Sequence, residues 1–355
     1  MKRHLTSIAD IQSRQEVEDL FKLADDIQCK RSMEKTLFNR FFRGANKYDN
    51  ALKGKQVAML FFEPSTRTRF SFESAVNRLG GKKLAMSNAA SSSTVKGESI
   101  EDTVRTIMGY ADAIVIRHSD DDAVHRAAAV SDEFSEYHGV PLVPIINAGS
   151  GVAHHPTQSL LDVYTLRKLK GQIDWLELGL LGDLKYGRTT HSLVELLSLY
   201  NKIKVYGCAP KGLEMPQKYI DFMTSKGIQY THCSSIEEIP YRVGALYSTR
   251  IQRERFNGEG YREEDYCLDA KKLSRFSSDT LVMHPLPRNS EISTDIDNDP
   301  RAIYFEQAHN GVPVRQAVLL KLIEQANESK KYFRYAKTVW QGYGSKKQTE
   351  PVKSV

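Results

Sequence analysis

The stretch that decides the fold is VAMLFFEPSTRTRFSFESAVNRLGG, residues 57–81. It opens with an apolar run, residues 57–62, that has the length and composition of a buried strand. The polar turn STRTR, residues 65–69, follows at once, and the apolar residues after it have the spacing of an amphipathic helix. A strand that passes through a polar turn into a helix is typical of parallel sheets covered by helices.

The same turn has the composition of an anion site. The free amides of a helix's first turn and the positive end of its dipole attract negative charge. The hydroxyls of Ser65, Thr66 and Thr68 and the guanidinium of Arg67 add further donors. Residues two apart do not share a helix face, so we expect one of Arg67 and Arg69 to reach the anion and the other to form ion pairs within the loop. An Arg-rich turn that faces solvent is the alternative, but helix starts ordinarily favour acidic side chains.

Apolar runs alternate with helical patterns along almost the whole chain, which predicts an α/β fold. A chain of 355 residues exceeds the usual size of a single core. We therefore expect two domains, each a parallel sheet covered by helices, with the active site in the cleft between them. The strands are expected near residues 56–62, 83–86, 113–117, 143–147, 177–183, 203–208, 244–249 and 280–284.

Two turn-rich segments suggest where the domains meet. The segment NAGSG at residues 147–151 is a plausible boundary, and NGVP at residues 310–313 predicts a break between a helix at 301–309 and another at 314–324. The expected organisation is a first domain at 1–153 that is completed by a returning helix at 312–330, a second domain at 154–311, and a basic, flexible tail at 331–355.

The net charge of +6 lies in that tail. Residues 329–355 carry seven Lys and Arg residues against Glu350 alone, so the remaining body of the chain sums to zero. A basic extension on a neutral body differs from the basic face of a nucleic-acid-binding domain. Nucleic acid is therefore not an expected partner, although binding through the tail stays open as an accessory property.

Other classes of protein are disfavoured by composition. The four cysteines lie far apart without a C-x-x-C pair, which argues against a disulfide framework and against a structural metal. The N-terminal residues MKRHLTSIADIQ do not form a secretory leader, and no apolar run approaches the length that spans a bilayer. We expect a cytoplasmic protein without a metal or a membrane segment.

Chemistry-bearing side chains follow the predicted strands, at the sheet edge where open parallel sheets bind ligands. Most of them are basic, so the ligands should be polyanionic. These segments contain no G-x-S-x-G, H-E-x-x-H or Walker-type motif, which leaves direct transfer between two bound anions. The residues that are basic, or can become so, are Arg67, Lys96, Arg117, His155, Arg188 and Arg250.

Seven motifs, taken together and in order, resemble those of the aspartate carbamoyltransferase family. They span roughly residues 50 to 325 and read FFEPSTRTRFSFE, KGES, RH, HPTQSLLD, GDLKYGRTTHS, STRIQRERF and HPLPR. The resemblance implies transfer of a carbamoyl group from carbamoyl phosphate to the amine of L-aspartate, with no cofactor. It also implies a homotrimer whose subunits share active sites.

The resemblance assigns a carbamoyl phosphate site. Its phosphate would lie against Ser65, Thr66, Arg67 and Thr68, and Arg117 would bridge the phosphate and the carbonyl oxygen. The carbonyl oxygen gains negative charge as the amine attacks, so Thr68, Arg117 and His155 would stabilise it. The carbamoyl NH2 needs acceptors, which the resemblance assigns to Gln158 and to the backbone carbonyls of Pro285 and Leu286. The Leu286-Pro287 bond is expected to be cis.

The resemblance also assigns the second substrate. Arg188 and Arg250 have the planar fork that suits two carboxylates, and Gln252 would add selectivity. Lys96 and a serine taken as Ser92, though Ser91 and Ser93 are equally placed in the sequence, would enter the site from the neighbouring subunit. Glu63 is expected to pair with Arg188 and Arg255 when the two domains close, which would exclude water from a reactive acyl phosphate.

Two alternatives remain. Ornithine carbamoyltransferase shares the STRTR and HPTQ elements, but that family has a cysteine where Pro285 stands here and must bind a cationic amino acid. A homologue without activity that serves as a sensor or scaffold would be expected to have lost a site residue, and none of the six basic positions is missing. The sequence does not reveal whether regulatory subunits act on the chain.

Overall fold

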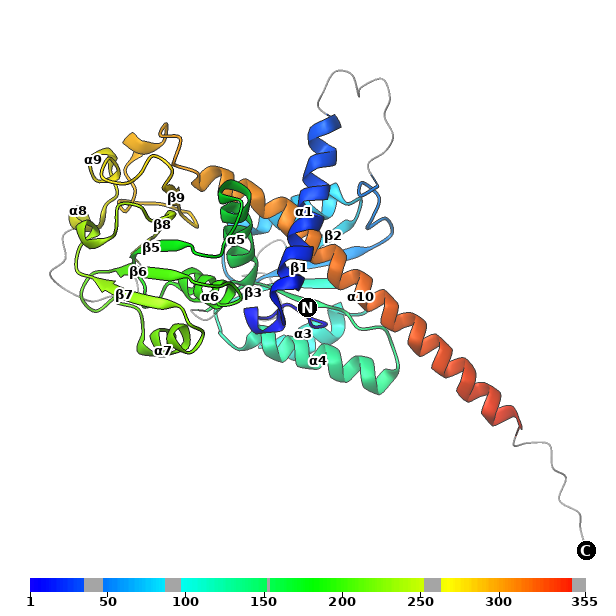
Figure 1. Ribbon diagram of the computed structural model, residues 1–355. Helices are drawn as coiled ribbons and strands as arrows, with labels where there is room; N and C mark the ends of the chain where they lie inside the picture. Colours follow the sequence, from blue (N-terminus) through cyan, green and yellow to red (C-terminus); the bar gives the residue numbers. More distant parts are fainter. Residues whose placement is uncertain (35–46, 87–96, 152–153, 252–262, 347–355) are drawn as a thin grey trace, which may run out of the picture.

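The computed structural model describes residues 1–34, 47–86, 97–151, 154–251 and 263–346. Figure 1 shows two parallel sheets, each with helices packed on it, which confirms the predicted fold class. Four strands form one sheet in the order β2-β1-β3-β4, and five form the other in the order β7-β6-β5-β8-β9.

The first sheet is parallel throughout. Its central strand β1 is buried on both faces, with Val57 and Met59 packed in one core cluster and Ala58 and Leu60 in another. This is why the sequence reads there as a continuous apolar run rather than an alternating one. The strands are β1 (Gln56–Phe61), β2 (Lys82–Ala85), β3 (Ala113–His118) and β4 (Ile145–Ser150), and the helices beside them are α2 (Thr66–Arg78), α3 (Ile100–Ile107) and α4 (Ala123–His138).

The second sheet is also parallel and contains one strand that the sequence did not predict. This strand, β7, lies at the sheet edge and is mostly exposed, so its sequence QYTHC lacks the apolar run that marks a buried strand. The strands are β5 (Glu177–Gly182), β6 (Lys204–Cys208), β7 (Gln229–Cys233), β8 (Ala245–Thr249) and β9 (Leu281–Met283), and the helices are α6 (Arg188–Leu197), α7 (Gln217–Ser225), α8 (Glu263–Tyr266) and α9 (Ala270–Leu273).

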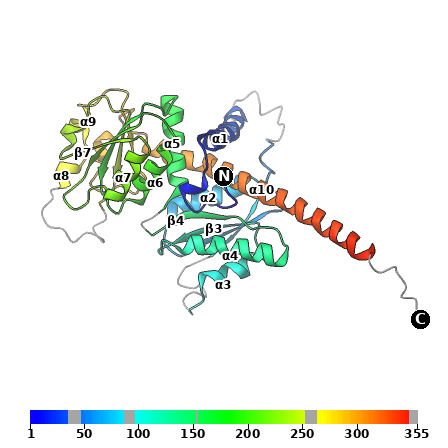
Figure 2. The same cartoon turned by 60° about the horizontal axis from the view of Figure 1, so that its bottom comes forward.

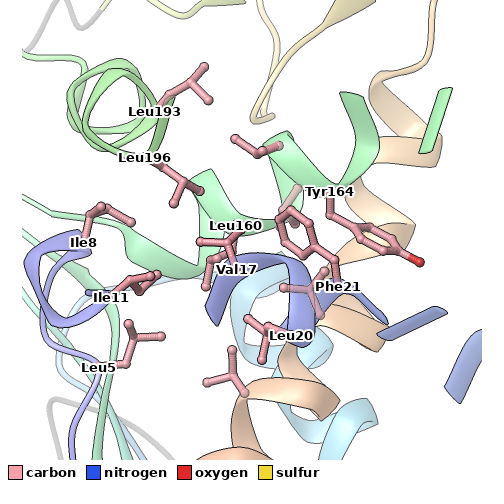
Figure 3. Close-up of a cluster of buried hydrophobic side chains, with 14 of the residues drawn as sticks. Leu5, Ile8, Ile11, Val17, Leu20, Phe21, Leu160, Tyr164, Leu193 and Leu196 are labelled. Carbon is pink, nitrogen blue, oxygen red and sulfur yellow. The ribbon is translucent and has the colours of Figure 1, made fainter. Parts of the chain in front are cut away.

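Three further helices pack against one another beside the two sheets: α1 (Arg14–Glu34), α5 (Pro156–Lys170) and α10 (Tyr304–Lys346). Figures 1 and 2 both place α5 between the sheets, and α10 runs beside it before extending away from the body. Figure 3 shows Phe21 of α1, Tyr164 of α5 and Leu193 of α6 in one buried cluster. The first core cluster therefore continues from one sheet to the other.

The predicted break at residues 310–313 is wrong, because α10 continues through it with Pro313 inside the helix. Tertiary contacts account for the continuity. Asn310 is buried and its Nδ2 donates to Thr165 Oγ1 of α5 at 3.0 Å. Gly311 leaves room for a guanidinium, since a Cβ there would lie 2.2 Å from Arg315 Nη1. The helix also continues to Lys346 where a tail was expected from residue 331, and residues 347–355 lie outside the described part.

The predicted turn at residues 147–151 is also corrected, because β4 extends through Ser150. Asn147 supports this extension: its Nδ2 donates to Thr6 O at 2.7 Å and to Ser150 Oγ at 3.0 Å. Within the described residues, no helix combines the length and the hydropathy that crossing a membrane requires.

Candidate active site

A cleft of about 610 Å³ lies where the carboxyl ends of strands from both sheets meet. The β1–α2 turn, the end of β3 and the start of α5 line it, together with the β5–α6 turn, the end of β8 and the HPLP turn at residues 284–287. The sequence-predicted residues that line it are Glu63, Ser65, Thr66, Arg67, Thr68, Arg117, His155, Gln158, Arg188, Arg250, Pro285 and Leu286. Four more, Ser92, Lys96, Gln252 and Arg255, lie outside the described residues.

The start of α2 forms one end of the cleft. Ser65 is the N-cap residue, and within the described residues its side chain makes no capping bond to the helix. Arg67 lines the cleft, and burial lowers the pKa of its guanidinium. Arg69 instead donates to Glu73 at 2.9 Å, and Glu73 also pairs with Lys83. Arg69 thus forms an ion pair within α2, as one of the two arginines was expected to do, while Arg67 lines the cleft.

A charge cluster occupies the middle of the cleft. Glu63 Oε2 lies 2.8 Å from Arg117 Nη2 and 3.4 Å from Arg188 Nη2, so one carboxylate joins the ends of β1 and β3 to the start of α6. The pairing with Arg188 was expected, whereas the pairing with Arg117 was not. Arg117 is buried, and its Nη1 donates to the carbonyl of Ala148 at 3.3 Å.

The cleft has an excess of positive charge. Among its described lining residues, five guanidinium groups face the single carboxylate of Glu63. Burial and the charge of Arg188 lower the pKa of Arg117 to about 10. The cationic form is thus less favoured here than in water, and a bound anion would stabilise it. The electrostatics favour a ligand with several negative charges.

His155 is the N-cap residue of α5 and lies beside this cluster. Its backbone N donates to Ser192 Oγ at 3.1 Å, while its Nδ1 is buried without a hydrogen-bond partner in the described part of the chain. Burial, with Arg188 and Arg117 nearby, holds the pKa of the imidazole well below its ordinary value. The ring is therefore neutral at pH 7 and can donate one hydrogen bond from its N–H group.

The HPLP turn, residues 284–287, also lines the cleft. His284 braces it, because its Nδ1 accepts from the backbone N of Leu286 at 2.8 Å while Nε2 lies 2.8 Å from Glu291 Oε1. This arrangement puts the ring proton on Nε2, toward the carboxylate. Leu286 has φ +53°, and the Leu286-Pro287 bond is cis, as expected.

Sequence reasoning missed Arg315, a buried residue of α10 that lines the cleft. Its Nη1 donates to Ser71 Oγ at 2.9 Å, and its guanidinium lies over the ring of Phe72 at 5.1 Å. Burial lowers its pKa to about 10. The available signal was a single arginine among the apolar positions of VRQAVLL. Gln307 of α10 also lines the cleft and was missed.

Comparison with known proteins gives a consistent result. The family model described as aspartate/ornithine carbamoyltransferase, carbamoyl-P binding domain, matches residues 3–168, and the Asp/Orn binding domain of the same family matches residues 175–322. The aspartate carbamoyltransferase catalytic subunit of Methanobrevibacter smithii is 48% identical, covering 77% of this chain and 84% of its own. That of Methanothrix thermoacetophila is 42% identical, covering 91% of this chain and 99% of its own.

Solved structures agree in fold. The catalytic subunit of M. jannaschii aspartate transcarbamoylase matches with a TM-score of 0.79 and 39% identity, over 91% of this chain and 98% of that one. The Trypanosoma cruzi enzyme in complex with N-(phosphonacetyl)-L-aspartic acid matches with a TM-score of 0.78 and 36% identity, over 89% of this chain and 94% of that one. With both domain models matched in order and relatives this similar over most of the chain, this protein belongs to the aspartate/ornithine carbamoyltransferase family, among its aspartate carbamoyltransferases.

Proposed function

We propose that this protein transfers the carbamoyl group of carbamoyl phosphate to the amine of L-aspartate, giving N-carbamoyl-L-aspartate and phosphate, a reaction of de novo pyrimidine biosynthesis. The observation that carries the proposal is the cleft itself, whose described lining has five guanidinium groups and one carboxylate and so suits two anionic substrates bound side by side. In support, the related Trypanosoma cruzi enzyme has been crystallised with carbamoyl aspartate and phosphate.

The reaction is a direct attack without a covalent enzyme intermediate. The aspartate amine forms a bond to the carbamoyl carbon, the bond from that carbon to the phosphate oxygen breaks, and the departing phosphate takes up the proton that the amine loses. Phosphate would leave toward Ser65, Thr66 and Arg67 at the start of α2. Negative charge on the carbonyl oxygen would be stabilised by Thr68, Arg117 and the neutral ring of His155.

The two carboxylates of aspartate would be bound by arginines from different elements. Arg188 begins α6 and Arg250 follows β8, so both come from the second sheet and line the cleft opposite the phosphate site. Their planar guanidinium groups suit carboxylates, and a cationic acceptor such as ornithine would be repelled by them. Gln252 and Lys96 would complete the aspartate site.

We place the domains at residues 1–153, completed by the part of α10 at residues 312–330, and at residues 154–311. Closure of these domains would bring Glu63 to Arg188 and Arg255. The pairing of Glu63 with Arg188 at 3.4 Å supports this proposal, because it already crosses between the two sheets.

We place Ser92 and Lys96 in the site of a neighbouring subunit of a homotrimer. The edge strand β2 supports this arrangement, since all four of its residues are exposed. Leu84 of this strand is 36% exposed, and Phe70 of α2 is 63% exposed. A groove of about 460 Å³ in the same region is lined by Leu60, Phe62 and Leu84 among others. Apolar surface of this kind is typical of a subunit interface.

The test measures product formation by the purified protein with carbamoyl phosphate and either aspartate or ornithine as acceptor. We expect carbamoyl-aspartate to form and ornithine not to react. Equal or greater turnover of ornithine would overturn the assignment. Thermal stabilisation by N-(phosphonacetyl)-L-aspartic acid without turnover would instead identify a homologue that binds the ligands and does not catalyse.

A further inference from the structure

Asp162 is a fully buried carboxylate in α5 that the proposed reaction does not use. It accepts three hydrogen bonds from side chains on three different elements. Gln158 Nε2 donates to Oδ1 at 2.9 Å, Gln307 Nε2 donates to the same oxygen at 2.6 Å, and the Tyr247 hydroxyl donates to Oδ2 at 2.8 Å. A buried carboxylate is costly unless it is satisfied in this way.

The partners of Asp162 belong to the wall of the cleft. Gln158 lines the cleft one helical turn before Asp162, and Gln307 lines it from α10. The Oε1 atom of Gln307 accepts from the backbone N of His284 at 2.9 Å, where the HPLP turn begins. Asp162 thus lies behind the region in which the proposed function places the carbamoyl NH2.

The geometry decides which way the Gln158 amide faces. Oδ1 of Asp162 receives two N–H donors, so it must act as an acceptor whether or not the carboxyl group carries a proton on Oδ2. Burial raises the pKa of Asp162 to about 7, but the two amide bonds are compatible with both protonation states. Because Nε2 of Gln158 is committed to Asp162, its oxygen remains as the acceptor for a ligand.

We propose that Asp162 is a positioning residue that selects carbamoyl phosphate over isosteric acyl phosphates by holding Gln158 with its amide oxygen available to the carbamoyl NH2. The inference rests on the proposed function. An acyl phosphate whose NH2 is replaced by a methyl group has nothing to donate to that oxygen. A site built from acceptors should therefore reject such a ligand.

The test compares the affinities of three probes, carbamoyl phosphate, acetyl phosphate and inorganic phosphate, for the full-length protein and its variants. Asp162→Leu and Asp162→Asn form a matched pair, since the three side chains have similar shapes and only Leu lacks an acceptor. We expect Asp162→Leu to lower the preference for carbamoyl over acetyl phosphate about tenfold, the effect of losing one oriented hydrogen bond. We expect phosphate affinity to stay within about twofold, because the proposed function places phosphate at the start of α2, whereas the hydrogen-bond partners of Asp162 are Gln158, Gln307 and Tyr247.

Two control variants distinguish a loss of Gln158 orientation from a general structural disturbance of the cleft. Asp162→Asn keeps an oxygen at the Oδ1 position and should retain the preference. Tyr247→Phe removes the donor to Oδ2 but leaves both amide bonds to Oδ1, so it should do the same. If Asp162→Leu does not fold, Asp162→Leu with Gln307→Met removes the other amide left without an acceptor and should show the loss of preference. Gln307→Met alone also removes the acceptor of His284 N, and it should keep the preference.

The outcomes are distinct. A folded Asp162→Leu variant that keeps the preference overturns the inference, and so does loss of the preference in Asp162→Asn. A parallel loss of phosphate affinity in Asp162→Leu would also overturn it, by making Asp162 a residue of general structural importance. Failure of the unsubstituted protein to bind carbamoyl phosphate would instead count against the proposed function.

Discussion

At the scale of single residues, the site is organised by charges that are incompletely balanced. Glu63 contacts both Arg117 and Arg188. Burial and the charge of Arg188 lower the pKa of Arg117 by more than Glu63 raises it. An anionic substrate would supply the missing negative charge. The same cations, which repel one another in the cleft, would therefore contribute to substrate binding and to stabilising negative charge in the transition state.

Substitutions of Arg117, which we place at the carbamoyl oxygen, and of Arg250, which we place at the aspartate carboxylates, should differ in their kinetic effects. Arg117→Ala should lower kcat about a hundredfold or more, as loss of an oxyanion donor commonly does. Arg250→Ala should mainly raise the KM for aspartate. Steady-state kinetics with each substrate varied in turn measure both. If Arg250→Ala weakened carbamoyl phosphate binding and left the aspartate dependence unchanged, the two half-sites would have been assigned the wrong way round.

The neutral state of His155 has a consequence for stability. Its pKa is ordinary in the unfolded chain and well below that value in the folded protein. As the pH falls below about 6.5, the unfolded state binds a proton that the folded state does not, so the free energy of unfolding decreases by up to about 1.4 kcal/mol per pH unit.

His155→Gln removes this titration and should have a shallower loss of stability between pH 6.5 and pH 5.5. Urea unfolding of both proteins at several pH values measures the difference, and the other histidines cancel because both proteins contain them. Identical slopes for the two proteins would show that His155 is not held neutral by the fold.

At the scale of elements, β4 sets the spacing between two site residues that come from different elements. Gly149 lies in this strand with φ +119°, and a Cβ there would be 2.8 Å from Arg117 Nη1 and 3.3 Å from His155 Cδ2. The strand backbone thus approaches both side chains more closely than any other residue would allow.

Gly149→Ala should displace the Arg117 guanidinium and lower kcat by about tenfold or more. Gly171→Ala is the matched control, because Gly171 also has positive φ, at +79°, but has open space around it. Both variants should lose about 1 kcal/mol of stability from backbone strain, and only Gly149→Ala should lose activity. Chemical denaturation and kinetics on both proteins test this. Equal activities would contradict the proposed spacing role of β4.

At the scale of the whole molecule, one buried cluster joins elements of both sheets. Ile8, Phe21, Leu160 and Leu193 all belong to it, although they come from four separate segments of the chain (Figure 3). The cleft lies beside this shared core. The core therefore fixes the positions of cleft residues from one sheet relative to those from the other. The proposed neighbouring subunit would then complete the cleft from outside.

Hybrid trimers test the shared site. Arg67→Ala and Lys96→Ala should each be nearly inactive, because every site then lacks one substrate contact. After dissociation and random reassociation of an equal mixture, about a quarter of the sites should contain an intact Arg67 and an intact Lys96 from different subunits. Activity that stays at the average of the two variants, in a sample with confirmed hybrids, would place Lys96 in its own subunit's site.

Local chemistry in the sequence was sufficient for much of this protein. The apolar run of β1, the turn at residues 65–69 and the start of α2 are encoded by neighbouring residues, so they could be predicted without knowledge of the fold. The same holds for the basic side chains that follow buried strands, which parallel topology brings to one edge. Arg117, His155 and Arg188 therefore line the cleft as expected.

Contacts between distant segments decided the rest. The strand β7 exists because β6 offers it an edge, and α10 continues through Pro313 because Asn310 and Arg315 are held against other helices. Likewise, nothing local to Asp162 indicates that Tyr247 and Gln307 donate to it. Burial and long-range hydrogen bonding depend on which surfaces meet in space. The sequence by itself determined the strand-to-helix units and most of the site's side chains, while only the tertiary structure decided how a buried carboxylate and a continuous helix hold them in place.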